Sequence, residues 1–140
     1  MNQIEAKVES IQDLGVVSYV YVQSAQMKLK IIKSKVPQWL DVGDTIYCNF
    51  QEASVCVGKD CTKQVSVENC LPAALKSIRK SEPLCELTFD SDMGEVVSLI
   101  TTDSLNLLDL KSGDNATMLI RGIDINLEPK IKVFDMKTYG

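Results

Sequence analysis

The chain has 140 residues, of which 45% are hydrophobic and 24% are charged, and this balance is typical of a folded globular protein. It contains no histidine, so histidine general bases, Ser-His and Cys-His catalytic pairs and His-ligated metal sites are excluded. The whole formal charge of -4 resides in residues 65–140, and neither half is basic. The electrostatic footprint expected of a nucleic-acid-binding protein is therefore missing, and the charge balance argues against nucleic acid as a partner.

The cysteines and the N-terminus predict a cytoplasmic protein without a membrane segment. The five cysteines are odd in number and contain no C-x-x-C pair, which is typical of reduced thiols and not of disulfides or a structural zinc. Cys48, Cys56 and Cys85 lie in strand-like runs and are predicted to be buried. The N-terminus lacks a basic and apolar leader, and the longest uncharged stretch, residues 14–27, is too short to cross a bilayer.

The first half of the chain predicts antiparallel strands and one short helix. Apolar residues alternate with polar ones in three segments, which predicts strands over residues 4–8, 16–22 and 27–31. One or two helical turns are predicted over residues 34–40, because Ser34 stands at an N-cap position and Pro37 is tolerated in a first turn. A turn at Gly43-Asp44 then precedes strands at residues 45–50 and 53–57.

The second half repeats this order of elements. It predicts strands over residues 84–89, 95–101, 116–121 and 123–127, with a serine-started helical segment at 104–108. An offset of 70 aligns the predicted helix cap and turn of the first half with those of the second: Ser34, Leu40, Gly43 and Asp44 fall on Ser104, Leu110, Gly113 and Asp114. At the N-terminal ends an offset of 67 is better and places Asn2 on Asn69.

The repeat predicts a mainly β protein built from two tandem, OB-like, five-stranded barrels, each with one short helix. The predicted parts are a first domain at residues 1–60, a linker at 58–64, a second domain at 65–130, and a strand or arm at 131–140. Domains this small bury little surface on their own, so association with another copy is expected.

The motifs of the second half carry a resemblance to a known family. LITTDSLNLLDLKSGD at residues 99–114, followed by ATMLIRGIDINL at 116–127, resembles the molybdenum-pterin-binding (Mop) proteins, which form the TOBE domain family. The first half follows the pattern more loosely, through Ser34, Leu40, Val42-Gly43-Asp44 and Phe50-Gln51. The two copies cover nearly the whole chain, which therefore resembles a tandem, or di-Mop, protein.

The resemblance implies a cytoplasmic binding protein and not an enzyme. It implies binding of molybdate or tungstate for storage, buffering or delivery of molybdenum, with sites formed between copies of a homo-oligomer, a trimer by preference. A molybdate transporter or a cofactor-assembly protein would be the further partner. The residues that match the family's oxyanion-binding positions are Thr101, Ser104, Arg121, Ser34, Gln51, Asn2 and Asn69.

The chemistry of these residue types suits an oxyanion. Molybdate is a tetrahedral dianion, which needs hydrogen-bond donors such as backbone N–H groups, hydroxyls, amides and a basic side chain, without direct ligands to the metal. A helix N-terminus supplies unpaired N–H groups and a partial positive charge, and Ser34 and Ser104 are predicted to stand at such positions.

Other interpretations of the same residues stay open. Ser34 and Ser104 also fit plain helix caps, and Arg121 fits a solvated strand residue. Gln51, where the family has a lysine, and Glu68, which precedes Asn69, favour a TOBE-type regulatory or interaction module. Such a module would dock on a transporter ATPase or a regulator, with weak or no oxyanion binding.

A third interpretation concerns the lysines of the first half, Lys28, Lys30, Lys33 and Lys35. They fit a solvated face that protects an edge strand. Together with Tyr19 and Tyr21 they also fit an OB-fold surface for single-stranded nucleic acid, against which the net charge argues.

Overall fold

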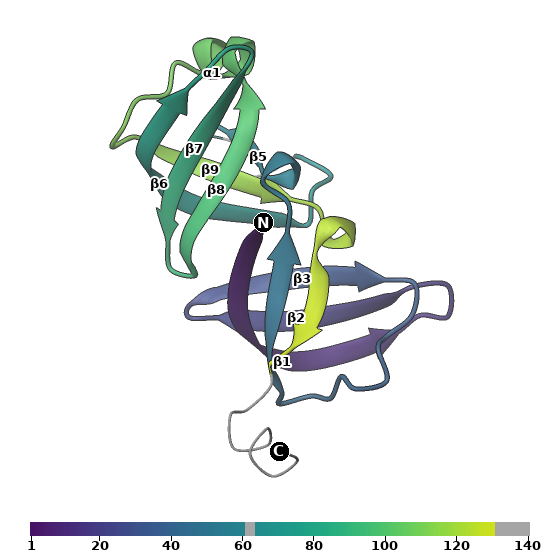
Figure 1. Cartoon of the computed structure of the whole chain (residues 1–140). Helices are drawn as coiled ribbons and strands as arrows, with labels where there is room; N and C mark the ends of the chain where they lie inside the picture. The colour runs from purple at the N-terminus through teal and green to yellow at the C-terminus, as the bar shows by residue number, and fades with distance from the viewer. Residues whose placement is uncertain (61–63, 131–140) are drawn as a thin grey trace.

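The protein is built almost entirely from β-strands. Its structure, a computed structural model, describes residues 1–60 and 64–130, so Cys61 of the predicted linker and the predicted arm at 131–140 lie outside the described residues. Within the described part, ten strands form two five-stranded antiparallel sheets, with one α-helix and two 3₁₀ turns. Figure 1 shows the two curled sheets one above the other. The predicted mainly β class is confirmed.

The first sheet has the strand order β10-β4-β1-β2-β3. Its strands are β1 (Asn2–Asp13), β2 (Ser18–Ser24), β3 (Met27–Lys33), β4 (Thr45–Phe50) and β10 (Asn126–Pro129). Alternate side chains of these strands are buried, as in β2, where Val20 and Val22 face the core while Tyr19 and Tyr21 stay half exposed. The alternation of apolar and polar residues in the sequence therefore matches the alternation of buried and exposed side chains in these strands.

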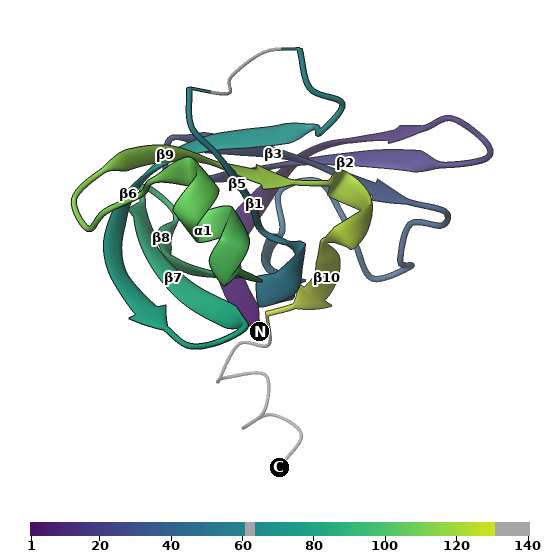
Figure 2. The ribbon, with the colours of Figure 1, turned by 90° about the horizontal axis from the view of Figure 1, so that it is seen from above.

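The second sheet has the order β5-β9-β6-β7-β8. Its strands are β5 (Cys56–Gly58), β6 (Asn69–Lys80), β7 (Leu84–Ser91), β8 (Gly94–Thr101) and β9 (Asn115–Ile120). The helix α1 (Thr102–Leu108) follows β8 and lies over the end of this curled sheet, as the view from above shows (Figure 2). Leu105 of α1 is buried and anchors the helix to the sheet.

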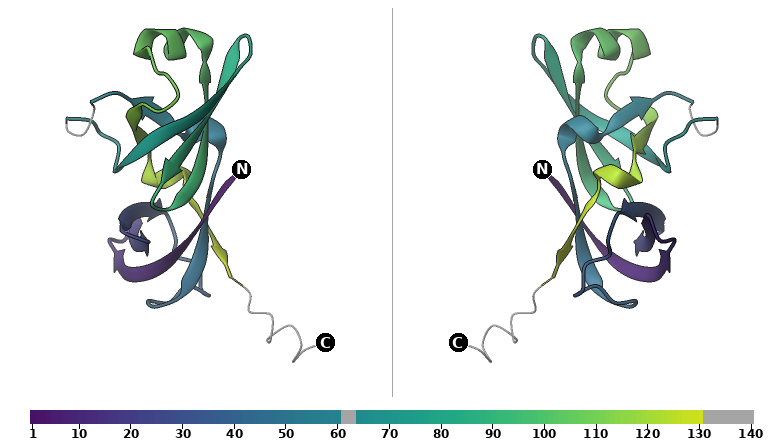
Figure 3. Two further views of the ribbon diagram at one scale, coloured as in Figure 1. Left: turned by 90° about the vertical axis from the view of Figure 1, so that its left-hand side faces the viewer. Right: turned by 90° about the vertical axis from the view of Figure 1, so that its right-hand side faces the viewer.

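Each sheet takes its fifth strand from the other half of the chain. β5 continues the first half but pairs with β9, so that Cys56 lies opposite Leu119. β10 ends the described chain but pairs with β4, so that Leu127 lies opposite Cys48. Figure 3 shows both crossings at the level between the sheets, where the N-terminus also lies. The two halves are therefore connected by backbone pairing in both directions.

Matching contacts occur at matching positions of the two halves. The N–H of Gly43 donates to the carbonyl of Val8 at 2.8 Å, and the N–H of Gly113 donates to the carbonyl of Leu75 at 2.7 Å. The register shifts directly after Val8 in β1 and after Leu75 in β6. Both glycines have positive φ, +95° and +96°, which glycine adopts without steric cost.

The prediction of one short helix in each half is wrong for the first half. Residues 34–40 contain a bend and a single turn, in which the N–H of Leu40 donates to the carbonyl of Pro37 at 3.1 Å. Ser34 lies in the bend and caps no helix. Two local reasons explain the difference. The N-cap of α1 is Thr101, whose counterpart 70 residues earlier is Ile31, an apolar residue that cannot cap a helix. In addition, Pro37 disfavours helical φ and ψ at the residue before it.

Three smaller predictions also need correction. Residues 53–55 and 123–125 do not belong to strands, because the 3₁₀ turns η1 (Glu52–Ser54) and η2 (Gly122–Asp124) precede the short strands β5 and β10. Cys48 and Cys85 are buried as predicted, whereas Cys56 is exposed on the edge strand β5.

Candidate functional site

Four of the predicted site residues lie at two junctions between the sheets. The first junction consists of Asn2, Gln51, η1 and the edge strand β8, and the second consists of Asn69, Arg121, η2 and the edge strand β3. Asn2 pairs with Phe50, directly before Gln51, and Asn69 pairs with Ile120, directly before Arg121. The strand exchange thus creates two equivalent places where a polar side chain, a turn and an unpaired strand edge meet.

The two asparagines bind the backbone of the opposite sheet. The amide of Asn2 donates to the carbonyl of Val97 and accepts from its N–H, both at 2.8 Å. The amide of Asn69 donates to the carbonyl of Lys30 at 3.0 Å and accepts from its N–H at 2.8 Å. Val97 is the counterpart of Lys30 at the offset of 67, so the two clamps are equivalent. In each, a side-chain amide takes the place of a neighbouring strand's peptide group.

The clamps leave little donor capacity for a ligand. Asn69 is 3% exposed and uses its second amide hydrogen on the carbonyl of Ile120 at 3.0 Å. Asn2 is 7% exposed and keeps one amide hydrogen beyond its two bonds to Val97. Asn69 therefore serves the fold in the structure described, while Asn2 retains a single donor.

At the second junction, the groups that could hold an anion are occupied by carboxylates of the chain itself. The guanidinium of Arg121 donates to both carboxylate oxygens of Asp124, from Nε at 2.9 Å and from Nη2 at 3.3 Å. The N–H of Gly122 donates to Oε1 of Glu68 at 2.8 Å. The Arg121 side of this ion pair is 66% exposed, so solvent screens the pair, which contributes at most about 1 kcal/mol to stability, and a stronger anion could displace it.

The first junction differs in its charges. Gln51 is exposed and stands at the position that corresponds to Arg121, so no guanidinium is present there. The carboxylate of Glu52 forms an ion pair with the N-terminal ammonium of Met1, and this hydrogen-bonded contact lowers the pKa of Glu52. The ion pair at the first junction therefore joins Glu52 to the N-terminal ammonium, whereas the ion pair at the second junction joins Asp124 to Arg121.

The hydroxyls of Thr101 and Ser104 form a pair at the start of α1. Thr101 is the N-cap: its Oγ1 accepts from the N–H of Ser104 at 3.1 Å and donates to Oγ of Ser104 at 2.9 Å. The helix thus begins at Thr102, with Thr101 and not Ser104 as its cap. Both hydroxyls are exposed, and the hydroxyl hydrogen of Ser104 remains available for an acceptor from solvent.

The structure brings six of the seven predicted residues together in three pairs. Asn2 lies beside Gln51, Asn69 beside Arg121, and Thr101 beside Ser104, while Ser34 lies in the bend that follows β3.

Lys33, which the sequence suggested as part of a solvated or ligand-binding basic face, instead links the two edge strands of the first sheet. Nζ of Lys33 donates to Oδ1 of Asn126 at 3.1 Å, which links the edge strands β3 and β10. Partial burial lowers the pKa of Lys33. The signal was present in the sequence, because Lys33 continues the inward series of Met27, Leu29 and Ile31.

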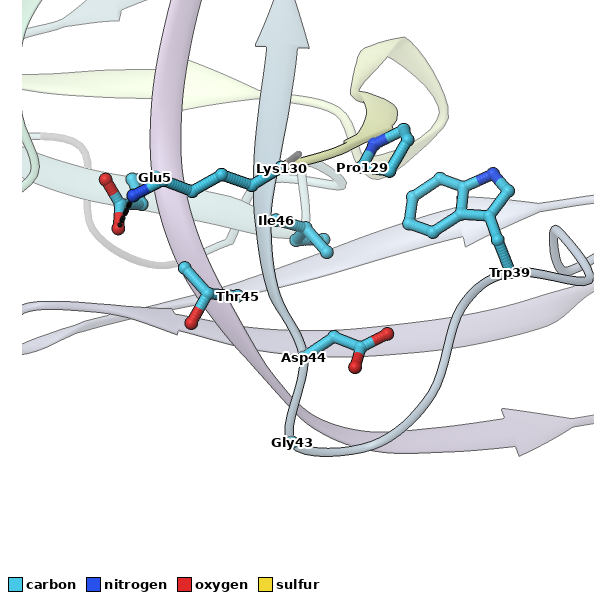
Figure 4. Close-up of a pocket in the computed structure, with 8 residues that line it drawn as sticks. All are labelled: Glu5, Trp39, Gly43, Asp44, Thr45, Ile46, Pro129 and Lys130. Carbon is cyan, nitrogen blue, oxygen red and sulfur yellow. Dashed lines mark hydrogen bonds and ion pairs between the residues drawn. The ribbon is translucent and has the colours of Figure 1, made fainter. Parts of the chain in front are cut away.

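A half-open cleft of about 480 Å³ lies on the outer side of the first sheet, beside Trp39 and Pro129. Figure 4 shows Lys130 extending across it to Glu5, and the two side chains form an ion pair at 2.8 Å. Asp44 adds a further carboxylate to the lining. Because its one ammonium group is neutralised and two carboxylates line it, this cleft does not suit an oxyanion.

Two further observations concern metal-binding groups and membrane-spanning helices in the described residues. No group of three or more histidine, cysteine, aspartate or glutamate side chains is placed to hold a metal ion in residues 1–60 and 64–130. Over the same ranges, no helix is long and apolar enough to span a membrane.

Comparison with known proteins gives one informative result. No protein-family model and no curated protein sequence matches the chain. Among solved structures, the chain is similar to the cytoplasmic molybdate-binding protein ModG. The crystal form of ModG with molybdate bound is 21% identical, with a TM-score of 0.84 over 92% of this chain and 96% of that chain. At this level of identity, the likeness shows a shared fold.

Proposed function

We propose that the protein binds molybdate or tungstate in the cytoplasm and stores, buffers or delivers molybdenum, without catalysing a reaction. The observation that carries this proposal is the similarity to molybdate-bound ModG over 92% of the chain. Because a fold alone does not define a function, the donor chemistry has to agree as well. It does so through exposed hydroxyl, amide and guanidinium groups in a chain without histidine.

The proposed contacts are the polar groups that remain open to solvent. Ser104 can donate its hydroxyl hydrogen beside the cap residue Thr101, and Gln51 can donate its exposed amide. The exposed guanidinium of Arg121 can exchange the carboxylate of Asp124 for a dianion, which carries more charge. Ser34 adds an exposed hydroxyl at the end of β3. Asn69, whose amide is saturated, supports the site only by holding the second junction together.

We propose that complete sites form between copies of the chain. A tetrahedral dianion needs several donors, and charged hydrogen bonds contribute about 1.5 to 3 kcal/mol each. Each of the three pairs, Asn2 with Gln51, Asn69 with Arg121 and Thr101 with Ser104, offers fewer donors than that, and in this proposal a second copy supplies the others. A homotrimer is the preferred assembly, and a molybdate transporter or a cofactor-assembly protein is the proposed recipient.

Isothermal titration calorimetry with molybdate, tungstate and sulfate tests the proposal. We expect heat with molybdate or tungstate, and Ser104→Ala combined with Arg121→Ala should weaken binding much more than Gln51→Ala does. Light scattering on the same samples would measure the mass of the assembly. If neither heavy oxyanion produces heat or a thermal shift, the proposal is rejected.

A second candidate function is favoured by the carboxylates at the second junction. Glu68 and Asp124 occupy the donors of Gly122 and Arg121, as expected of a TOBE-type interaction or regulatory module with weak or no oxyanion binding. Such a module would dock on a transporter ATPase or a regulator. Absence of molybdenum and tungsten from the native protein, together with a stable protein partner isolated from cells, would favour this function over the first.

A further inference from the structure

The outer side of β2 and β3 combines lysines with tyrosines. We define the basic face as Lys7, Tyr19, Tyr21, Lys28 and Lys30. Tyr21 lies directly opposite Lys30, while Gln23 lies between Lys28 on β3 and Lys7 on β1. Residues opposite each other in antiparallel strands point to the same side of the sheet, so these side chains share one surface. It belongs to the first sheet, which Figure 1 shows below the second.

The aromatic and cationic groups of the basic face are in direct contact. Nζ of Lys30 lies 3.9 Å from the ring centroid of Tyr19 and 5.9 Å from that of Tyr21. The two rings are 6.4 Å apart with an interplanar angle of 85°. The pair therefore offers ring surfaces in two orientations with an ammonium group held beside them.

The three lysines of the basic face have no carboxylate partner in the described part of the chain. The ion pairs there involve Lys76, Arg121, Lys130 and the N-terminus. On β1, Glu5 is paired with Lys130, while the exposed Glu9, two positions after Lys7, forms no ion pair with the lysines of the face in the described residues. The positive charge of the face is therefore available to a ligand, although the whole chain carries -4.

The second sheet shows that the fold does not require this arrangement. At the offset of 67, Tyr21 and Lys30 correspond to Thr88 and Val97, which also lie opposite each other. Tyr19 and Lys28 correspond to acidic residues, Glu86 and Glu95. The same strand pair is thus built once with a basic aromatic surface and once without one, so the difference points to a ligand.

We propose that the basic face binds single-stranded nucleic acid. The chemistry required is a polyanion that also carries aromatic rings: phosphates would contact the ammonium groups of Lys7, Lys28 and Lys30, and a base would stack on Tyr21. Sequence-tolerant binding of single strands combines these two interactions on a β-sheet surface. In this proposal nucleic acid binds a single local surface, which lies in the half of the chain whose net charge is zero.

Fluorescence anisotropy of the full chain with labelled oligothymidylate and oligouridylate tests this proposal. Three phosphate contacts predict that the logarithm of affinity falls with the logarithm of salt concentration with a slope of about -2. Lys28→Ala combined with Lys30→Ala should lower affinity about tenfold at low salt and reduce the slope to about -0.7. Tyr21→Ala should lower affinity about tenfold, whereas Tyr21→Phe should retain it, because the ring stacks.

The controls separate this surface from general attraction of anions. Lys76→Ala combined with Lys80→Ala removes the same charge from β6 of the second sheet and should leave affinity unchanged, while circular dichroism checks that each variant is folded. The proposal is overturned if no single strand binds at low salt, or if both lysine pairs have equal effects. It is also overturned if inorganic polyphosphate or an acidic peptide of equal charge competes as well as the oligonucleotide and Tyr21→Ala has no effect. None of these outcomes depends on molybdate binding.

Discussion

Replacing Asn69 with alanine should destabilise the protein while leaving most of its surface unchanged. The side chain is 3% exposed and makes three hydrogen bonds to the backbone, with the N–H and the carbonyl of Lys30 and with the carbonyl of Ile120. Alanine removes all three bonds and leaves the part-buried N–H and carbonyl of Lys30 and the buried carbonyl of Ile120 without this partner. The variant therefore tests whether the amide holds the two sheets together.

The expected loss follows from the number of bonds. A net contribution of about 1 kcal/mol per hydrogen bond gives a loss of about 3 kcal/mol for Asn69→Ala. Asn2→Ala removes two such bonds at the first junction and should cost about 2 kcal/mol. For a chain of this size, the larger loss corresponds to a melting temperature lower by about 10 °C.

Urea denaturation followed by circular dichroism would measure both losses. Asn106→Ala is a matched control, because Asn106 is exposed on α1, and its change should stay within about 0.5 kcal/mol. The reasoning is refuted if Asn69→Ala is as stable as this control. It is equally refuted if Asn69→Ala keeps its stability but loses molybdate affinity, since the amide would then serve the ligand.

Three further predictions concern the second junction and the core. Gly122→Ala should lower the free energy of unfolding in urea by about 1 to 3 kcal/mol, because the added Cβ would lie 2.5 Å from the carbonyl oxygen of Lys30. Glu52→Ala, at the corresponding position of the first half, should lower it by less than about 1 kcal/mol, and equal losses would contradict this reasoning. Glu68→Gln combined with Asp124→Asn should raise molybdate affinity in calorimetry about tenfold, because it removes two negative charges and leaves weaker, neutral acceptors on the donors of Gly122 and Arg121. Arg121→Ala should cancel this gain, and an unchanged affinity would show that the carboxylates do not compete. Burial raises the pKa of Cys48 from 9.0 to about 12. The contribution of the neutral thiol to stability is therefore complete below pH 9 and is lost as pH rises toward 12. The melting temperature should fall more steeply with pH in the wild type than in Cys48→Ala, and parallel curves would refute the assignment.

Local sequence patterns were sufficient to predict those features of the structure that depend only on neighbouring residues. Alternation over Met27, Leu29 and Ile31 predicted a strand with one buried side, and β3 has it. The Gly43-Asp44 and Gly113-Asp114 turns were predicted at both positions, and both glycines bind the backbone of the long first strand of their half. Turn chemistry and side-chain period are properties of short segments, so a single sequence reveals them.

The helix prediction failed where one local signal was given too much weight. Ser34 and Ser104 align at the offset of 70, but the residue that caps α1 is Thr101, which has no polar counterpart at Ile31. A shared serine was therefore a weaker signal than the cap three residues before it. With Pro37 also opposing a helix, the first half forms only a turn.

The sequence by itself determined most of the strands, the repeat and the exclusion of histidine chemistry, although no strand was predicted for β6. Only the tertiary structure decided which partners the polar residues bind, because those partners lie far away in the chain. Asn2 binds a backbone group 95 residues away, Asn69 one 39 residues away, and Glu68 one 54 residues away. The same holds for β5 and β10: short strands carry no local record of the sheet they join, since their backbone hydrogen bonds form only when the two halves meet. Asn69, whose role as an oxyanion ligand stays a prediction, thus bonds to the backbone of both sheets, which its place in the sequence did not reveal.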